Sequence, residues 1–319
     1  MKKTFLIFLS FFVSVCCVAQ HITVADEQDL QQQENTMKVY ANEVLNADLP
    51  QDKFAADSVF TRMLVRALKT HNSFYYPFDS LETISRLYAP DSSFRIFTWQ
   101  LVLDDNIIFQ HGAIQMRTAD GSLKLFPLID RSKVINDIVD TVADNKSWIG
   151  AVYYKIVETK NNNHNYYTLI GYDEDNIRSN RKIIDVLTFD ENNKPVFGGP
   201  YFVFGKTLVQ NTPIARYVIE YKKDAAPKLN YDDDMGMIIV EHLESETGEP
   251  NKKWTLIPDG DYEGFKWANG KWIHIDKVFT QITPEGKEPV PHPLKDNNGN
   301  LLDDKLDNST PAKPAPSKD

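Results

Sequence analysis

The sequence predicts an α+β protein that is mainly β, with N-terminal helices followed by an antiparallel β-rich meander. Apolar residues recur at helical spacing between Val24 and about Tyr88, whereas from Phe94 onward β-branched and aromatic residues come in short runs. Short turns rich in Asn, Asp and Gly separate many of these runs, which favours antiparallel pairing. A sandwich or a barrel is the simplest arrangement, and a propeller is the alternative, although no repeat of fixed length is present.

Residues 20–90 are expected to form the helical N-terminal region. The first helix carries one apolar stripe and ends at Pro50, and Asp52 is the expected N-cap of a second helix. Asp79 or Ser80 could cap a short third helix. The apolar residues expected to face the core are Leu30, Met37, Ala41 and Val44 in the first helix, Phe60, Met63, Leu64, Ala67 and Leu68 in the second, and Leu81, Ile84 and Leu87 in the third.

Residues 91–282 are expected to form the antiparallel β-rich domain, with one helical interruption at Ser132 to Val142, where apolar residues keep helical spacing. The expected strands are Phe94 to Leu103, Ile107 to Arg117, Ser122 to Ile129, Trp148 to Glu158, Asn165 to Tyr172, Lys182 to Phe189, Pro195 to Phe204, Ala215 to Lys222, Met235 to Leu243, Trp254 to Pro258, Tyr262 to Trp267 and Trp272 to Phe279.

The two ends of the chain differ in composition from this body. Residues 1–19 begin with Lys2 and Lys3, continue with an uncharged apolar run and end in small residues, which is typical of a secretory signal peptide cleaved before Gln20. Residues 283–319 are rich in Pro, Asp and Lys and lack aromatic residues, so a disordered tail is expected.

Cysteine content and charge narrow the expected environment and partners. Cys16 and Cys17 are the only cysteines, so cleavage after Ala19 would exclude disulfides and cysteine-ligated metals, whereas lipidation of either cysteine is the alternative that would anchor the protein to a membrane. We expect a periplasmic or extracellular location and no transmembrane segment after cleavage. The net charge of −10, about −12 without Lys2 and Lys3, argues against nucleic acid as a partner.

Several strand and turn phrases resemble those of secreted proteins from Bacteroidetes bacteria for which no activity is known. They are Tyr166-Tyr167-Thr168-Leu169-Ile170-Gly171-Tyr172-Asp173, Lys182-Ile183-Ile184-Asp185-Val186-Leu187, Gly236-Met237-Ile238-Ile239-Val240-Glu241-His242-Leu243 and Pro258-Asp259-Gly260-Asp261-Tyr262-Glu263-Gly264-Phe265-Lys266-Trp267. The resemblance covers residues 95–280. It implies export and a β-rich body, and it implies no site.

The last expected hairpin contains the clearest candidate ligand site. Asn269-Gly270 suits a two-residue turn, which would pair Trp267 with Trp272. Counting outward, the same register pairs Phe265 with His274, so Phe265, Trp267, Trp272 and His274 are expected on one face. This face could be an aromatic platform for a sugar ring or a peptide. The competing interpretation is a core cluster that stabilises the sheet.

A metal site is a weaker expectation. Asp232, Asp233 and Asp234 could offer oxygen ligands to calcium, but the full calcium-loop pattern is absent, and a solvated turn is the preferred interpretation. The seven histidines show no metal-binding spacing and no G-x-S-x-G elbow is present, so no cofactor and no catalytic residue is predicted. The sequence favours a non-catalytic exported envelope protein that binds a protein or glycan or takes part in assembly; the alternative is a secreted hydrolase acting on glycan or peptide.

Overall fold

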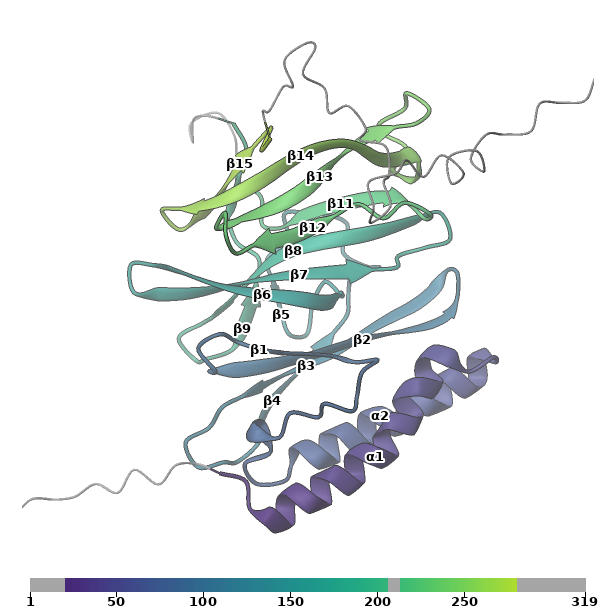
Figure 1. Cartoon of the computed structure of the whole chain (residues 1–319), viewed down its shortest axis with the longest axis vertical. Helices are drawn as coiled ribbons and strands as arrows, with labels where there is room; N and C mark the ends of the chain where they lie inside the picture. The colour runs from purple at the N-terminus through teal and green to yellow at the C-terminus, as the bar shows by residue number, and fades with distance from the viewer. Residues whose placement is uncertain (1–20, 206–212, 280–319) are drawn as a thin grey trace, which may run out of the picture. The chain divides into compact units, whose positions relative to one another are not determined.

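The computed structural model describes residues 21–205 and 213–279. Two helices precede a series of strands that form three sheets, which confirms the mainly β, α+β class (Figure 1). The expected signal peptide with Cys16 and Cys17, and the expected tail over 283–319, lie outside the described residues.

The N-terminal helices are α1 (Val24–Asn46) and α2 (Pro50–Leu68). The α1 helix buries the predicted stripe together with Glu34, whose carboxylate accepts hydrogen bonds from the Tyr76 hydroxyl and from the Ser80 amide. Pro50 is the first residue of α2 rather than the end of α1, because proline suits the first helical turn, where an amide proton has no partner. Asp52 therefore lies inside α2 and is not its cap.

The strands form three open sheets, here called the first, middle and last sheets. In the described residues no sheet closes on itself, so the sheets stack as in a sandwich rather than forming a barrel. The first sheet contains, in spatial order, β1 (Ser85–Tyr88), β2 (Phe94–Asp104), β3 (Ile107–Met116) and β4 (Lys124–Ile129). The middle sheet contains, in spatial order, β5 (Ala143–Asp144), β9 (Pro195–Phe197), β8 (Ser179–Phe189), β7 (His164–Asp173) and β6 (Val152–Asn161), and β11 (Tyr217–Lys222) also pairs with β8. The last sheet contains, in spatial order, β10 (Phe202–Val203), β15 (Lys271–Ile275), β14 (Leu256–Ala268), β13 (Met237–Ser245) and β12 (Leu229–Asp232).

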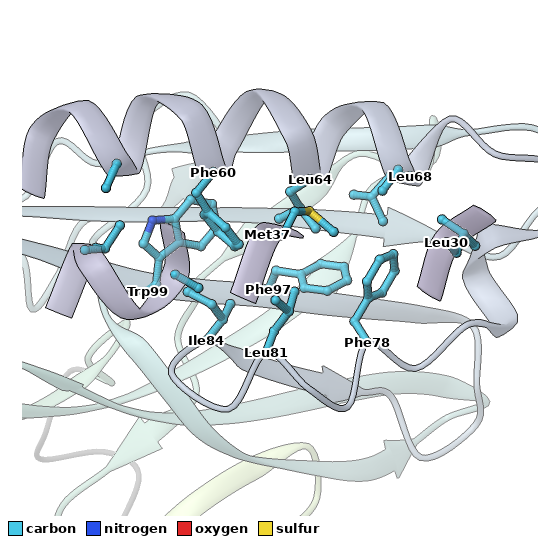
Figure 2. Packing of buried hydrophobic residues seen from close by; sticks show 14 of the residues in the cluster. Leu30, Met37, Phe60, Leu64, Leu68, Phe78, Leu81, Ile84, Phe97 and Trp99 are labelled. Atoms are coloured by element: carbon cyan, nitrogen blue, oxygen red, sulfur yellow. The ribbon is translucent and has the colours of Figure 1, made fainter. Parts of the chain in front are cut away.

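Three hydrophobic clusters hold the helices and the sheets together as layers. One face of β2 packs Phe97 and Trp99 against α1 and α2 (Figure 2), while Phe94 and Ile96 on its other face pack against the middle sheet. This split follows the period of two of a strand. The middle sheet is buried on both faces, since alternate residues of β7 and β8 contribute to the second and third clusters. The third cluster joins it to the last sheet.

Two segments expected to be helical are not. Residues Ser85–Tyr88 form β1, paired antiparallel with β2, and Leu81 and Ile84 reach the first cluster from turns instead of from a third helix. Residues 132–142 form turns. There the Asp137 carboxylate accepts hydrogen bonds from the amides of Val139 and Asp140, which competes with a helical hydrogen-bond pattern.

A buried ion pair fastens this turn segment to the middle sheet. Arg216 and Asp185 are both fully buried, and Arg216 Nε lies 2.9 Å from Asp185 Oδ2. The Nη1 group of Arg216 also donates to the carbonyls of Ile138 and Thr141. Burial raises the pKa of the Asp185 carboxyl, and Arg216 acts in the opposite direction. The pair therefore anchors the turns over 138–141 to β8.

The C-terminal hairpin matches its predicted register. Trp267 pairs with Trp272 and Phe265 with His274, and both Asn269 and Gly270 have the positive φ that their turn requires. The two strands expected over 254–267 form the single strand β14. Pro258 is accommodated because it lies beyond the end of β15 and has a neighbouring strand on one side only.

Candidate functional site

The four residues of the predicted aromatic platform lie together but do not form an exposed surface. Phe265 and Trp272 are fully buried in the third cluster, and Trp272 Nε1 donates to Thr168 Oγ1 across the sheet interface at 2.9 Å. Trp267 packs at the edge of this cluster against Tyr166 and Trp272. Neither Phe265 nor Trp272 offers a ring face for a sugar, and both act as core residues.

The three consecutive aspartates lie at the end of β12 and in the turn that leads to β13. Asp232 Oδ1 accepts the Met235 amide and the Asp232 carbonyl accepts the Gly236 amide, while Asp233 forms an ion pair with Lys155 at 3.1 Å. Over residues 21–205 and 213–279, no group of three or more His, Cys, Asp or Glu side chains is placed to hold a metal ion. These contacts are those of a turn.

The fourth platform residue, His274, belongs to a different constellation. Its Nε2 lies 2.8 Å from Glu263 Oε2, and its Nδ1 lies 3.1 Å from Asp276 Oδ1. Tyr217 of β11 donates its hydroxyl proton to Glu263 Oε1, so a partly buried carboxylate joins the middle sheet to the last sheet. Burial alone would raise the pKa of the Glu263 carboxyl, but the hydrogen bonds from His274 and Tyr217 outweigh burial and lower it. Glu263 is therefore ionised at neutral pH.

Glu263 and Tyr217 line a cleft of about 450 Å³ between β11 and strands β13 and β14. This volume is within the range of small-molecule sites in proteins. We call it the β11 cleft. Its lining residues are Ile138, Val139, Arg181, Tyr217, Val218, Ile219, Glu220, His242, Leu243, Lys253, Leu256 and Glu263.

Most charged groups of the β11 cleft have a partner within the protein. Glu220 accepts the Ser179 hydroxyl at 2.6 Å and lies 3.4 Å from Arg181, which also pairs with Asp175 at 2.8 Å. His242 Nδ1 lies 2.6 Å from Asp259 Oδ2. Lys253 differs: its ammonium donates to the Pro250 carbonyl at 3.2 Å, and among the described residues no carboxylate lies within 4.0 Å of it. The cleft thus combines two carboxylates with a cation that has no acidic partner.

An exposed tryptophan lies beside the cleft. Trp254 follows Lys253 in a short 3₁₀ helix over Lys253–Thr255 that packs on β11, and it is 40 % exposed with the Arg178 guanidinium 5.3 Å from its ring centre. Sequence reasoning assigned Trp254 to a strand and missed it as a surface residue. Glu263, in contrast, could have been found, because extending the predicted hairpin register by two residues places it diagonally opposite His274.

Comparison with protein-family models, with curated proteins and with solved structures found no match to this chain. Among the described residues, no helix has both the length and the apolar character needed to cross a membrane.

Proposed function

We propose that this protein is a non-catalytic binding protein that takes a small zwitterionic ligand, such as a free amino acid or a dipeptide, into the β11 cleft. The observation that carries the proposal is the placement of Lys253, a cation without an acidic partner, in one cleft with the carboxylates of Glu220 and Glu263. Lys253 would bind the ligand carboxylate. The apolar wall of Ile138, Val139 and Leu256 would cover a side chain.

The two carboxylates retain capacity for an ammonium group. Each oxygen of Glu263 accepts one hydrogen bond, from Tyr217 or His274. Glu220 Oε1 accepts one from Ser179, whereas Glu220 Oε2 accepts two from Arg181. A carboxylate oxygen has two acceptor sites, so a ligand ammonium can bind at either oxygen of Glu263 or at Glu220 Oε1 without displacing these partners. The fixed partners hold both carboxylates in place before the ligand arrives, which lowers the entropic cost of binding.

The same geometry supports binding over hydrolysis. A glycosidase acid needs a raised pKa, whereas the pKa of Glu263 is lowered. His242 is oriented by Asp259 as a general base would be, yet no Ser, Thr or Cys is among the described residues that line the cleft. The alternative is a secreted hydrolase, and the experiment below distinguishes it from a binding protein. In such a hydrolase, the exposed ring of Trp254 would contact the substrate.

The test is isothermal titration of the purified protein with dipeptides, with their N-acetylated and C-amidated forms, and with free amino acids. Blocking either end should weaken binding at least tenfold. In Lys253→Gln, C-amidation of the dipeptide should no longer weaken binding. Lys252→Gln is the matched control, in which C-amidation should still weaken binding, because Lys252 pairs with Glu249. No binding across the panel would refute the ligand class. Cleaved dipeptide in the titrated sample, detected by mass spectrometry, would refute a non-catalytic role.

We also propose export, on the basis of residues 1–19. N-terminal sequencing of the protein made in a Gram-negative host should find Gln20 as the first residue. A first residue at Cys16 or Cys17 with an attached lipid would instead establish the anchored alternative.

A further inference from the structure

A second cavity lies where β4 separates from β3 at the edge of the first sheet. The two strands pair from His111 and Ile129 to Met116 and Lys124. Beyond Ile129 the chain leaves β3, since the amides of Ile129 and Arg131 donate to the carbonyls of Asn145 and Trp148. β3 itself continues to Ile107, paired with β2 on its other side. Residues 107–110 therefore have no neighbouring strand on the β4 side among the described residues.

The cavity between these segments has a volume of about 330 Å³. We call it the β3 slot. Its lining residues are Ile108, Phe109, Gln110, His111, Leu128, Ile129, Asp130, Arg131, Lys133 and Val134. Four free residues at about 3.3 Å per residue correspond to roughly 13 Å of strand edge, enough for about four residues of an added strand.

The rim of the β3 slot is apolar. Phe109 is 45 % exposed, Ile129 is 42 % exposed and Val134 is 71 % exposed. Phe109 pairs with Leu101, and Ile129 pairs with His111, which pairs with Trp99, so Phe109 and Ile129 lie on the face that α1 and α2 cover elsewhere in the first sheet. An edge strand with apolar neighbours and no partner favours pairing with another chain.

The charge of the slot is opposite to that of the whole protein. Arg131 and Lys133 are exposed, and among the described residues neither has a carboxylate within 4.0 Å. Lys133 reaches across the slot to the Asn106 carbonyl at 3.3 Å and lies 6.0 Å from the Phe109 ring centre. The nearest acid in the sequence, Asp130, instead accepts the amides of Ser132 and Gly150. Lys133 also interacts with the Asp175 carboxylate, at a distance beyond that of an ion pair. With a net charge of −10 for the chain, two cations that have no carboxylate in direct contact, beside an open strand edge, mark a site for an acidic partner.

We propose that the β3 slot binds an extended segment of a partner protein, which adds as a strand beside residues 107–110. Main-chain hydrogen bonds would supply affinity, as in other cases of strand addition. Alternate apolar side chains of the segment would pack on Phe109 and Ile129, and an acidic residue would pair with Arg131 and Lys133. This site is separate from the β11 cleft and does not rest on the function proposed for it.

Selection of a displayed library of random eight-residue peptides against the full protein tests this proposal. The enriched sequences should alternate β-branched residues with Asp or Glu. Their binding, measured by fluorescence anisotropy, should weaken at least tenfold in the double variant Arg131→Glu/Lys133→Glu. It should be unchanged in Arg62→Glu/Lys38→Glu, which reverses two exposed charges on α2 and α1. Lys253→Gln should also leave it unchanged, which separates this site from the β11 cleft.

Hydrogen exchange supplies the structural readout. Bound peptide should slow exchange of amides within residues 107–110, while circular dichroism should show that the charge variants remain folded. The proposal is overturned if no peptide is enriched, if the enriched peptides lack acidic residues, or if the slot charge reversal leaves their affinity unchanged. It is also overturned if sedimentation shows that the protein self-associates through this edge, because the occupant would then be a second copy.

Discussion

Removal of the Arg216 guanidinium should destabilise the protein more than most single substitutions. In Arg216→Met the fully buried Asp185 loses its ion-pair partner, and the carbonyls of Ile138 and Thr141 lose their donor. Breaking one side of a buried ion pair costs about 3–5 kcal/mol. Since 1 kcal/mol shifts the melting temperature of a chain of this size by about 2–4 °C, the expected fall is about 6–20 °C.

The pH dependence of this variant tests the cause of the loss. Without Arg216, burial should keep Asp185 protonated in the folded state, with a pKa far above the unfolded value of about 3.9. The unfolded chain then binds fewer protons than the folded one above about pH 4. The free energy of unfolding should therefore fall as pH rises, by up to about 1.4 kcal/mol per pH unit.

The assay is chemical unfolding of the native protein and three variants at several pH values. The double variant Arg216→Met/Asp185→Asn should lack the extra slope and should be more stable than Arg216→Met at neutral pH. Arg62→Met, an exposed position on α2, should change stability by less than about 0.5 kcal/mol. If Arg216→Met remains within about 1 kcal/mol of the native protein, or if its pH profile matches that of the double variant, the buried pair does not have the assigned role.

Three further predictions concern other parts of the structure and use the same unfolding measurements. Burial, followed by the nearby Asp175 charge, raises the pKa of Asp173 to about 6, so the free energy of unfolding of the native protein should fall by about 3 kcal/mol between about pH 4 and pH 6. Asp173→Asn should remove this fall. An unchanged pH profile in Asp173→Asn would contradict the assignment. Phe265→Ala should cost about 3–5 kcal/mol if Phe265 is a core residue, whereas a loss below about 1 kcal/mol would favour a surface platform. Gly270→Ala should lower the free energy of unfolding at least as much as Gly248→Ala, because both glycines have positive φ and an added Cβ at Gly270 also lies 2.6 Å from Asn161 Nδ2, whereas nothing lies within 4 Å at Gly248. Equal losses would show that the Asn161 side chain moves aside, and a smaller loss for Gly270→Ala would contradict the reasoning.

The sequence predicted those parts of the fold that depend on local chemistry. The Asn269-Gly270 turn sets the hairpin register, so the pairing of Trp267 with Trp272 could be counted from it. The α1 stripe could likewise be read from its spacing, apart from Glu34, whose burial depends on the distant Tyr76. The turn sequence could not show that Trp272 is buried in the third hydrophobic cluster.

The failures occur where tertiary contacts override local pattern. Leu81, Ile84 and Leu87 have helical spacing, but hydrogen bonding of Ser85–Tyr88 to β2 makes that stretch extended. The β11 cleft could not be assembled from sequence, because Tyr217 and Glu263 come from strands of different sheets. Lys253 stands out only once the partners of the other charged residues are known.

The pairing of β10 with β15 has a consequence for the order in which the protein can fold during synthesis. Phe202 lies beside Trp272, 70 residues later in the chain. A nascent chain that stops before Leu256 lacks β14 and β15, so Ile184 and Val186 of the middle sheet remain partly uncovered. Contacts of such long range slow folding, and exposed β-rich intermediates aggregate. C-terminal truncations that remove β15 should therefore yield insoluble protein rather than a shorter folded domain.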